Sequence, residues 1–291
     1  MSEYGSHVVP SDLSHDDVQR GYARIERGIL SEATPRSECP RTADYAIAYP
    51  PVCRKPYLLV NFHGMVTRPK YQPPIYGRFT SSAQLGAITV FVSDPVLRMH
   101  PESRIGWFLQ AEPMSDDLLR LAVGIARRND LAAIVWNGWS AGGYAAIRYA
   151  WRASSESMPS MAFAYAPQNY PPDLSWWGNY RLSLPAELAS DPYCERTGQH
   201  PPRRPLPRRV CTLFEEEFRN DYFRAAIRAN DGDVAHIVEH LRPIITSARE
   251  SDRLDWAVLR NGLGHGEESN EIFWEEFEIA TTRWWRAHGT T

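Results

Sequence analysis

Gly138-Trp139-Ser140-Ala141-Gly142 is the stretch of this sequence that decides the fold class. The pentapeptide has the pattern G-x-S-x-G. Before it runs the short apolar segment 132–136, typical of a buried strand, and after it runs the small-residue segment 143–150, typical of a helix. A serine on such a tight strand-to-helix turn is held in a strained conformation with its hydroxyl exposed. The stretch therefore predicts a nucleophilic serine, Ser140, at a helix N-terminus.

Short apolar runs alternate with helical patterns along most of the chain. Strands apolar throughout and separated by helices predict an α/β fold, a doubly wound and mostly parallel sheet with helices on both faces. Reactive groups are expected beyond the carboxyl ends of its strands. The expected strands are 45–49, 57–62, 87–92, 132–136, 161–166, 223–228 and 254–259, and the expected helices include one capped by Ser115 and one starting near Ser269.

The chain is expected to form one domain with an extension and an insertion. Residues 1–44 are polar, with a helix expected near 16–30, and residues 45–291 form the predicted α/β domain. The segment 168–221 interrupts the alternation and is dense in proline and aromatic residues, which predicts a lid-like insertion over the sheet edge. Its Trp176 and Trp177, with Trp139 beside the serine, are expected to line an apolar substrate pocket.

A nucleophilic serine needs a base, usually histidine, and an acid that orients the histidine. His265 is the expected base, because it lies after the last predicted strand in a loop with three glycines, 261–266. The acid should follow the preceding strand, where two aspartates compete. Asp233 is the expected acid, whereas Asp231 is the alternative, since Asn-Asp-Gly is also a turn signal.

His63-Gly64-Met65 directly follows a central predicted strand. The backbone N–H of Met65, together with that of Ala141, is expected to form a two-donor oxyanion hole. Gly64 would let the substrate approach the backbone closely, and the His63 side chain is expected to line the pocket.

A second pair of histidines, His236 and His240, lies four residues apart on one face of a predicted helix. Such a pair can bind a metal, but no third ligand is placed by the sequence, so we expect packing and no metal site. His236 comes one helical turn after Asp233 and could support the acid loop.

Composition limits the classes of function. The 291 residues are 43% hydrophobic and 23% charged with a formal net charge of −3, which predicts a soluble globular protein without a nucleic acid partner. We expect a cytoplasmic protein with no secretory signal, no membrane partner and four free cysteines. There is neither a G-x-G-x-x-G after the first strand nor a phosphate loop, so we expect no cofactor.

Taken together, these residues resemble the α/β-hydrolase superfamily. The matches are His63-Gly64, the pentapeptide around Ser140, an acid at Asp233 or Asp231, and Gly264-His265-Gly266, over roughly residues 45–291. The resemblance implies an eight-stranded, mostly parallel sheet, a Ser–Asp–His triad in that chain order, and a backbone oxyanion hole.

The chain also resembles hydrolase-like proteins of bacterial capsule and surface-glycan systems. This resemblance rests on the spacing of Asp233, His236 and His240 and on Trp107-Phe108-Leu109. The expected function is a serine hydrolase acting on a small-molecule ester or other activated acyl group. The alternatives are an acyltransferase using the same triad, for example in O-acetyl transfer on a glycan, and a non-catalytic binding protein.

Overall fold

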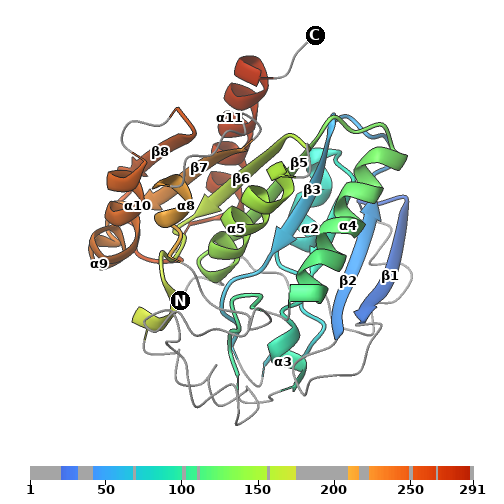
Figure 1. Ribbon diagram of the computed structural model, residues 1–291, viewed down its shortest axis with the longest axis horizontal. Helices are drawn as coiled ribbons and strands as arrows, with labels where there is room; N and C mark the ends of the chain where they lie inside the picture. The colour runs from blue at the N-terminus through green and yellow to red at the C-terminus, as the bar shows by residue number, and fades with distance from the viewer. Residues whose placement is uncertain are drawn as a thin grey trace.

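The computed structural model describes residues 21–31, 42–67, 70–99, 103–109, 112–155, 158–174, 209–215, 223–248, 252–266 and 268–288. Eight strands form one sheet in the order β1-β2-β4-β3-β5-β6-β7-β8 (Figure 1). The strands are β1 Arg24–Ser31, β2 Thr42–Tyr49, β3 Tyr57–Phe62, β4 Thr89–Val92, β5 Ala133–Trp139, β6 Ser160–Tyr165, β7 Phe223–Asn230 and β8 Leu254–Leu259. Strands β3 to β8 run parallel, and β1 and β2 are antiparallel to their neighbours.

Helices cover both faces of the sheet, as the alternating pattern predicts. The helical segments are α2 Phe79–Ser82, η1 Ala83–Leu85, α3 Pro95–Met99, α4 Glu112–Arg128, α5 Ala141–Ser155, η2 Pro171–Asp173, α8 Thr212–Glu215, α9 Val234–His236, η4 Ile237–Leu241, α10 Arg242–Ser247 and α11 Asn270–His288. In Figure 1, α4 and α5 lie in front of the sheet and α11 lies behind it. The doubly wound α/β prediction is therefore confirmed.

The two faces carry separate apolar cores. On one face, residues of α4, α5, α8 and α10 pack against the sheet, among them Leu118, Tyr144 and Ile244. On the other, Phe273 and Phe277 of α11 pack against strand residues on the opposite side of the pleat. The central strands β3, β5, β6 and β7 are buried almost throughout, which is why they are continuous apolar runs in the sequence.

Two expectations about helices are wrong. Residues 24–30 of the expected N-terminal helix belong to β1, which pairs with β2 over eight residues from Arg24 to Ser31. Residues 21–23 of that expected helix precede β1 and are not helical, and residues 16–20 lie outside the described residues. Ser115 does not cap α4, because this helix begins at Glu112 and Ser115 lies within it.

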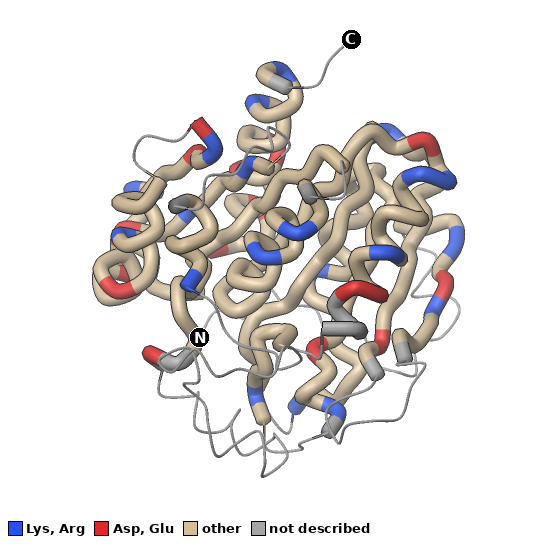
Figure 2. Tube along the Cα trace, viewed as in Figure 1, with Lys and Arg blue, Asp and Glu red and all other residues tan. Residues whose placement is uncertain are grey.

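Charged residues of both signs are interspersed along the described chain (Figure 2), in keeping with the formal net charge of −3. Among the described residues, no helix is both long and apolar enough to cross a membrane. Cys53 and Cys211 are free, and Cys39 and Cys194 lie outside the described residues.

Candidate active site

Ser140 lies on a sharp turn between β5 and α5. Its φ is +55°, a left-handed conformation that is strained for serine, and its N–H donates to Tyr165 O at 2.9 Å. Both glycines of the pentapeptide are required by close backbone contacts. A Cβ on Gly138 would lie 2.2 Å from the backbone carbon of Gly142, and a Cβ on Gly142 would lie 2.5 Å from Phe62 O. The turn thus has the geometry of a nucleophile elbow.

The structure brings His265 and Asp233 to this serine. The Nε2 of His265 lies 3.2 Å from Ser140 Oγ, and its Nδ1 lies 2.6 Å from Asp233 Oδ2. Because a carboxylate accepts, Nδ1 carries the proton and Nε2 is free to accept the proton of the serine. Burial alone would raise the pKa of Asp233, but the hydrogen bond and charge of His265 outweigh it and lower the pKa. Asp233 is therefore ionised at neutral pH.

Asp231, the alternative acid, has a different place in the structure. Its Oδ1 accepts the backbone N–H of Asn261 at 3.1 Å and of Gly262 at 2.7 Å, so it anchors the loop that carries His265. Gly232, between the two aspartates, packs directly under this loop, since a Cβ there would lie 2.5 Å from Leu263 O. The turn after β7, residues 231–233, and the loop 261–266 that carries His265 are thus held together by contacts to the backbone.

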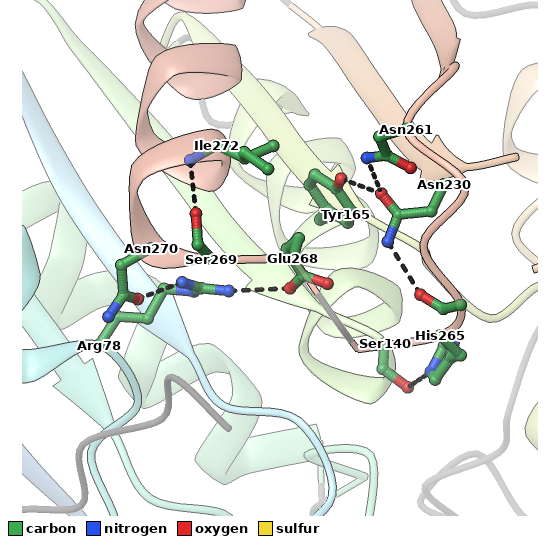
Figure 3. Close-up of polar contacts among 11 residues, drawn as sticks. Arg78, Ser140, Tyr165, Asn230, Asn261, His265, Glu268, Ser269, Asn270 and Ile272 are labelled. Carbon is green, nitrogen blue, oxygen red and sulfur yellow. Dashed lines mark hydrogen bonds and ion pairs between the residues drawn. The ribbon is translucent and has the colours of Figure 1, made fainter. Parts of the chain in front are cut away.

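Asn230, the last residue of β7, is a site residue that the sequence analysis missed. Its Oδ1 accepts from the hydroxyl of Tyr165 at 2.6 Å and from Nδ2 of Asn261 at 2.8 Å, and its Nδ2 donates to Gly264 O at 2.9 Å (Figure 3). This buried amide therefore ties β6 and β7 to the residue preceding His265. The turn signal Asn-Asp-Gly marked the position but could not show which groups the amide reaches.

His236 and His240 lie on the same side of the site as His265. Their rings are 4.8 Å apart, and the ring of His236 is also 4.8 Å from that of His265. The Nε2 of His236 lies 3.0 Å from Pro167 O, so this nitrogen carries a proton. Burial and the neighbouring histidines lower the pKa of His236 to about 3, which keeps the ring neutral.

Three side chains here have the residue types of a metal site. Asp233, His236 and His265 each offer a ligand atom, and these atoms lie within 4.8 Å of one another. Asp233 and His265 are already paired through a hydrogen bond, and Nε2 of His236 is engaged with Pro167 O. The three side chains are therefore held by hydrogen bonds within the protein.

His63 and Gly64 lie at the end of β3, and both ring nitrogens of His63 are engaged. Nδ1 donates to Gly64 O at 2.7 Å, and Nε2 accepts the N–H of Asp94 at 3.1 Å. The C=O of Gly64 and the N–H of Met65 belong to one trans peptide and point in opposite directions. The bond from His63 therefore fixes the direction of the Met65 N–H, which points away from the imidazole.

Gln168 also contacts the serine, and sequence analysis did not single it out. Its Nε2 donates to Ser140 Oγ at 3.3 Å, and its Oε1 accepts from the indole Nε1 of Trp107. Gln168 is the first residue of the predicted insertion. Its neighbour Asn169 accepts the N–H of Val210 through its backbone O and the N–H of Cys211 through its Oδ1, so the two described parts of that segment are joined. Trp176 and Trp177 lie outside the described residues, so their expected place in the pocket stays a prediction.

A small pocket lies beside the elbow on the face of the sheet that α11 covers. Its lining includes Trp139, whose ring is 5.3 Å from that of His265, and the buried pair Arg78 and Glu268, joined at 2.9 Å (Figure 3). Burial lowers the pKa of Arg78 to about 10 and raises that of Glu268, and their pairing opposes both shifts. Within the described part of the chain, Glu268 Oε2 and Asn61 Nδ2 have no partner, which suits an ordered water there.

Comparison with known proteins identifies the fold. No protein-family model matches the chain, and no curated protein matches its sequence. S-formylglutathione hydrolase from Agrobacterium tumefaciens matches with a TM-score of 0.52 at 17% identity, over 96% of this chain and 98% of that one. The capsule O-acetyltransferase of Neisseria meningitidis serogroup A matches with a TM-score of 0.54 at 12% identity, over 87% and 98%.

Porphyromonas gingivalis dipeptidyl peptidase 4 matches with a TM-score of 0.53 at 14% identity, over 90% of this chain but only 35% of that one. With the eight-stranded sheet and the serine elbow, these matches establish that the chain has the α/β-hydrolase fold. The fold hosts several chemistries, so the reaction has to be argued from the site itself.

Proposed function

We propose that this protein is a serine hydrolase that cleaves an ester or other activated acyl bond through an acyl-enzyme. The observation that carries the proposal is the chain of hydrogen bonds from Asp233 to His265 at 2.6 Å and from His265 to Ser140 at 3.2 Å. This order of acid, base and hydroxyl is the one that nucleophilic catalysis by serine needs. The half-exposed His265 leaves the site open to substrate and water.

In the proposed reaction, Ser140 Oγ attacks the carbonyl carbon while its proton passes to Nε2 of His265. The carbonyl electron pair moves onto the oxygen, and the tetrahedral intermediate collapses as His265 returns the proton to the departing alkoxide. Water then attacks the acyl-enzyme by the same steps in reverse. Asp233, ionised at neutral pH, holds the imidazole in the required tautomer and stabilises the imidazolium.

The proposed donors to the oxyanion are the N–H groups of Ala141 and Met65. Ala141 is the first residue of α5, where a backbone N–H has no acceptor within the helix. The Met65 peptide is oriented by His63, as described above. In this proposal His63 serves to preorganise the oxyanion hole, which reduces the reorganisation needed when negative charge develops.

An acyltransferase is the second candidate, because the same site would serve if a hydroxyl acceptor replaced water. The match to the capsule O-acetyltransferase, over nearly its whole length, favours this alternative, and a glycan hydroxyl would then be the acceptor. The two candidates share the acyl-enzyme and differ only in the group that resolves it.

The test is a panel of p-nitrophenyl esters of increasing acyl length, read with and without added alcohols and sugars. Ser140→Ala should lower turnover by several orders of magnitude with the fold intact. Ser81→Ala is the matched control, since its hydroxyl donates to Arg78 O in a turn, and it should keep full activity. Acceptor-dependent release of product without free acid would favour transfer. Turnover that survives Ser140→Ala would refute both candidates.

A further inference from the structure

Gln168 touches the reacting hydroxyl but has no part in the steps above. It follows β6 and Pro167, and it is only 8% exposed. Its amide lies between two fixed partners, the hydroxyl of Ser140 at 3.3 Å and the indole Nε1 of Trp107. The amide therefore bridges a fully buried ring and the atom that the proposed reaction uses as nucleophile.

The chemistry of Trp107 decides which way the amide faces. An indole N–H can only donate, so the amide atom beside it must be the oxygen. The NH₂ group of Gln168 must then face Ser140, whose Oγ accepts from it. The hydrogen of the serine remains free for Nε2 of His265, 3.2 Å away. The two contacts therefore leave the hydroxyl with one donor on its oxygen and one acceptor for its proton.

The segment that carries Trp107 is rigidly held. The carboxylate of Asp94 accepts the backbone N–H of Gly106 at 2.7 Å and of Phe108 at 3.2 Å. Trp107 and Phe108 both have φ of +53°, which is unfavourable for non-glycine residues and persists only where the surroundings enforce it. Gly106 leaves no room for a side chain, since a Cβ would lie 2.6 Å from Asp94 Oδ1. The strained segment thus presents the indole N–H to the amide.

We propose that Gln168 is a further catalytic residue, a side-chain donor that stabilises negative charge on Ser140 Oγ, and that Trp107 is its positioning residue. The inference rests on the proposed function. The N–H groups of Ala141 and Met65 are proposed to stabilise charge on the carbonyl oxygen, whereas Gln168 would stabilise charge on the nucleophile. It also gives a role to the first residue of the predicted insertion, where the sequence shows only an isolated glutamine.

The donor acts in the two steps in which Oγ carries charge. In acylation, the O–H bond of Ser140 breaks, its proton goes to His265, and Oγ bonds to the carbonyl carbon. In deacylation, the bond from Oγ to that carbon breaks, and Oγ takes the proton back from His265. Gln168 donates one hydrogen bond in both steps and transfers no proton. A donor aimed at developing charge lowers the barrier more than it stabilises the neutral hydroxyl.

The experiment measures the rate at which a fluorophosphonate labels Ser140, and kcat and KM with p-nitrophenyl acetate. Gln168→Met removes the donor with little change of volume, and both the labelling rate and kcat should fall by about 10- to 100-fold. KM should change little, because the hydrogen bond gains strength only in the transition state. Trp107→Phe leaves the amide but frees its orientation, and should lower kcat by about 10-fold or less.

Gln168→Glu supplies a readout that a merely structural role would not move. A protonated carboxyl can still donate to Oγ and a carboxylate cannot, so the ratio of variant to wild-type activity should rise as the pH falls. Gln84→Glu, at an exposed position, is the matched control and should follow the wild-type pH profile. If Gln168→Met fails to fold, the pH profile of Gln168→Glu decides.

The outcomes separate this inference from the function on which it rests. If wild-type protein neither labels nor turns over ester, the proposed function fails and the role of Gln168 fails with it. If the wild type reacts and Gln168→Met reacts within about twofold of it or faster, only the role of Gln168 is overturned. Faster reaction would mean that the amide restrains the hydroxyl. A ratio of Gln168→Glu activity to wild-type activity that stays constant across pH would overturn the role of Gln168 as well.

Discussion

Asn230→Ala should destabilise the protein and detach the histidine loop. The amide of Asn230 is 2% exposed and makes three hydrogen bonds, to Tyr165, Asn261 and Gly264. At about 1 kcal/mol net for each bond, the free energy of unfolding should fall by about 3 kcal/mol. Part of this loss comes from the hydroxyl of Tyr165, which would remain buried without the oxygen of Asn230 that it bonds now.

Urea denaturation followed by fluorescence, together with ester turnover, measures both effects. Tyr165→Phe is the matched variant, since it removes one of the bonds and keeps the hydrogen bond from Asn230 to Gly264. It should lower the free energy of unfolding by about 1 kcal/mol and leave turnover within a few-fold of wild type. Asp231→Ala removes two contacts to the exposed part of the loop and should also cost about 1 kcal/mol or less. The reasoning is refuted if Asn230→Ala unfolds at the wild-type urea concentration or retains full turnover when folded.

Three further predictions follow from burial and charge. A Cβ on Gly124 in α4 would meet nothing within 4 Å, so Gly124→Ala should raise the free energy of unfolding by about 0.5–1 kcal/mol. Gly138→Ala should lower the free energy of unfolding, because its Cβ would lie 2.2 Å from the backbone of Gly142. Thermal melting compares the two variants directly, and equal effects would contradict the prediction. Burial lowers the pKa of His236 to about 3, so below about pH 6.5 the unfolded chain binds more protons than the folded chain, and the free energy of unfolding should fall with the pH. In urea melts at a series of pH values, the free energy of unfolding of His236→Gln should depend less steeply on pH than that of the wild type. Arg78→Met leaves the carboxylate of Glu268 buried without its ion pair and should lower the free energy of unfolding by about 3–5 kcal/mol at neutral pH. The loss should be smaller at acid pH, where Glu268 takes up a proton. Calorimetry that finds the same loss at both pH values would disprove this prediction.

Most of the sheet could be predicted because its signals are local. The central strands are buried on both faces and are therefore apolar at every position, as in Tyr57–Phe62. Strand β1 could not be predicted, because its sequence RIERGILS mixes charged and apolar residues without a clear period. It is a strand because β2 offers eight residues for backbone pairing at the sheet edge.

The sequence by itself determined the elbow at Ser140, since a strand, two glycines and a small-residue helix specify that turn within a few residues. It also singled out His265 and narrowed the acid to two aspartates. Only the tertiary structure decided that Asp233 meets the imidazole while Asp231 holds the loop, and that Gln168 reaches the hydroxyl. The physical reason is that hydrogen bonds act over about 3 Å in space. A pattern along the chain specifies local conformation, whereas contacts between residues 28 to 125 positions apart depend on how the strands and loops pack.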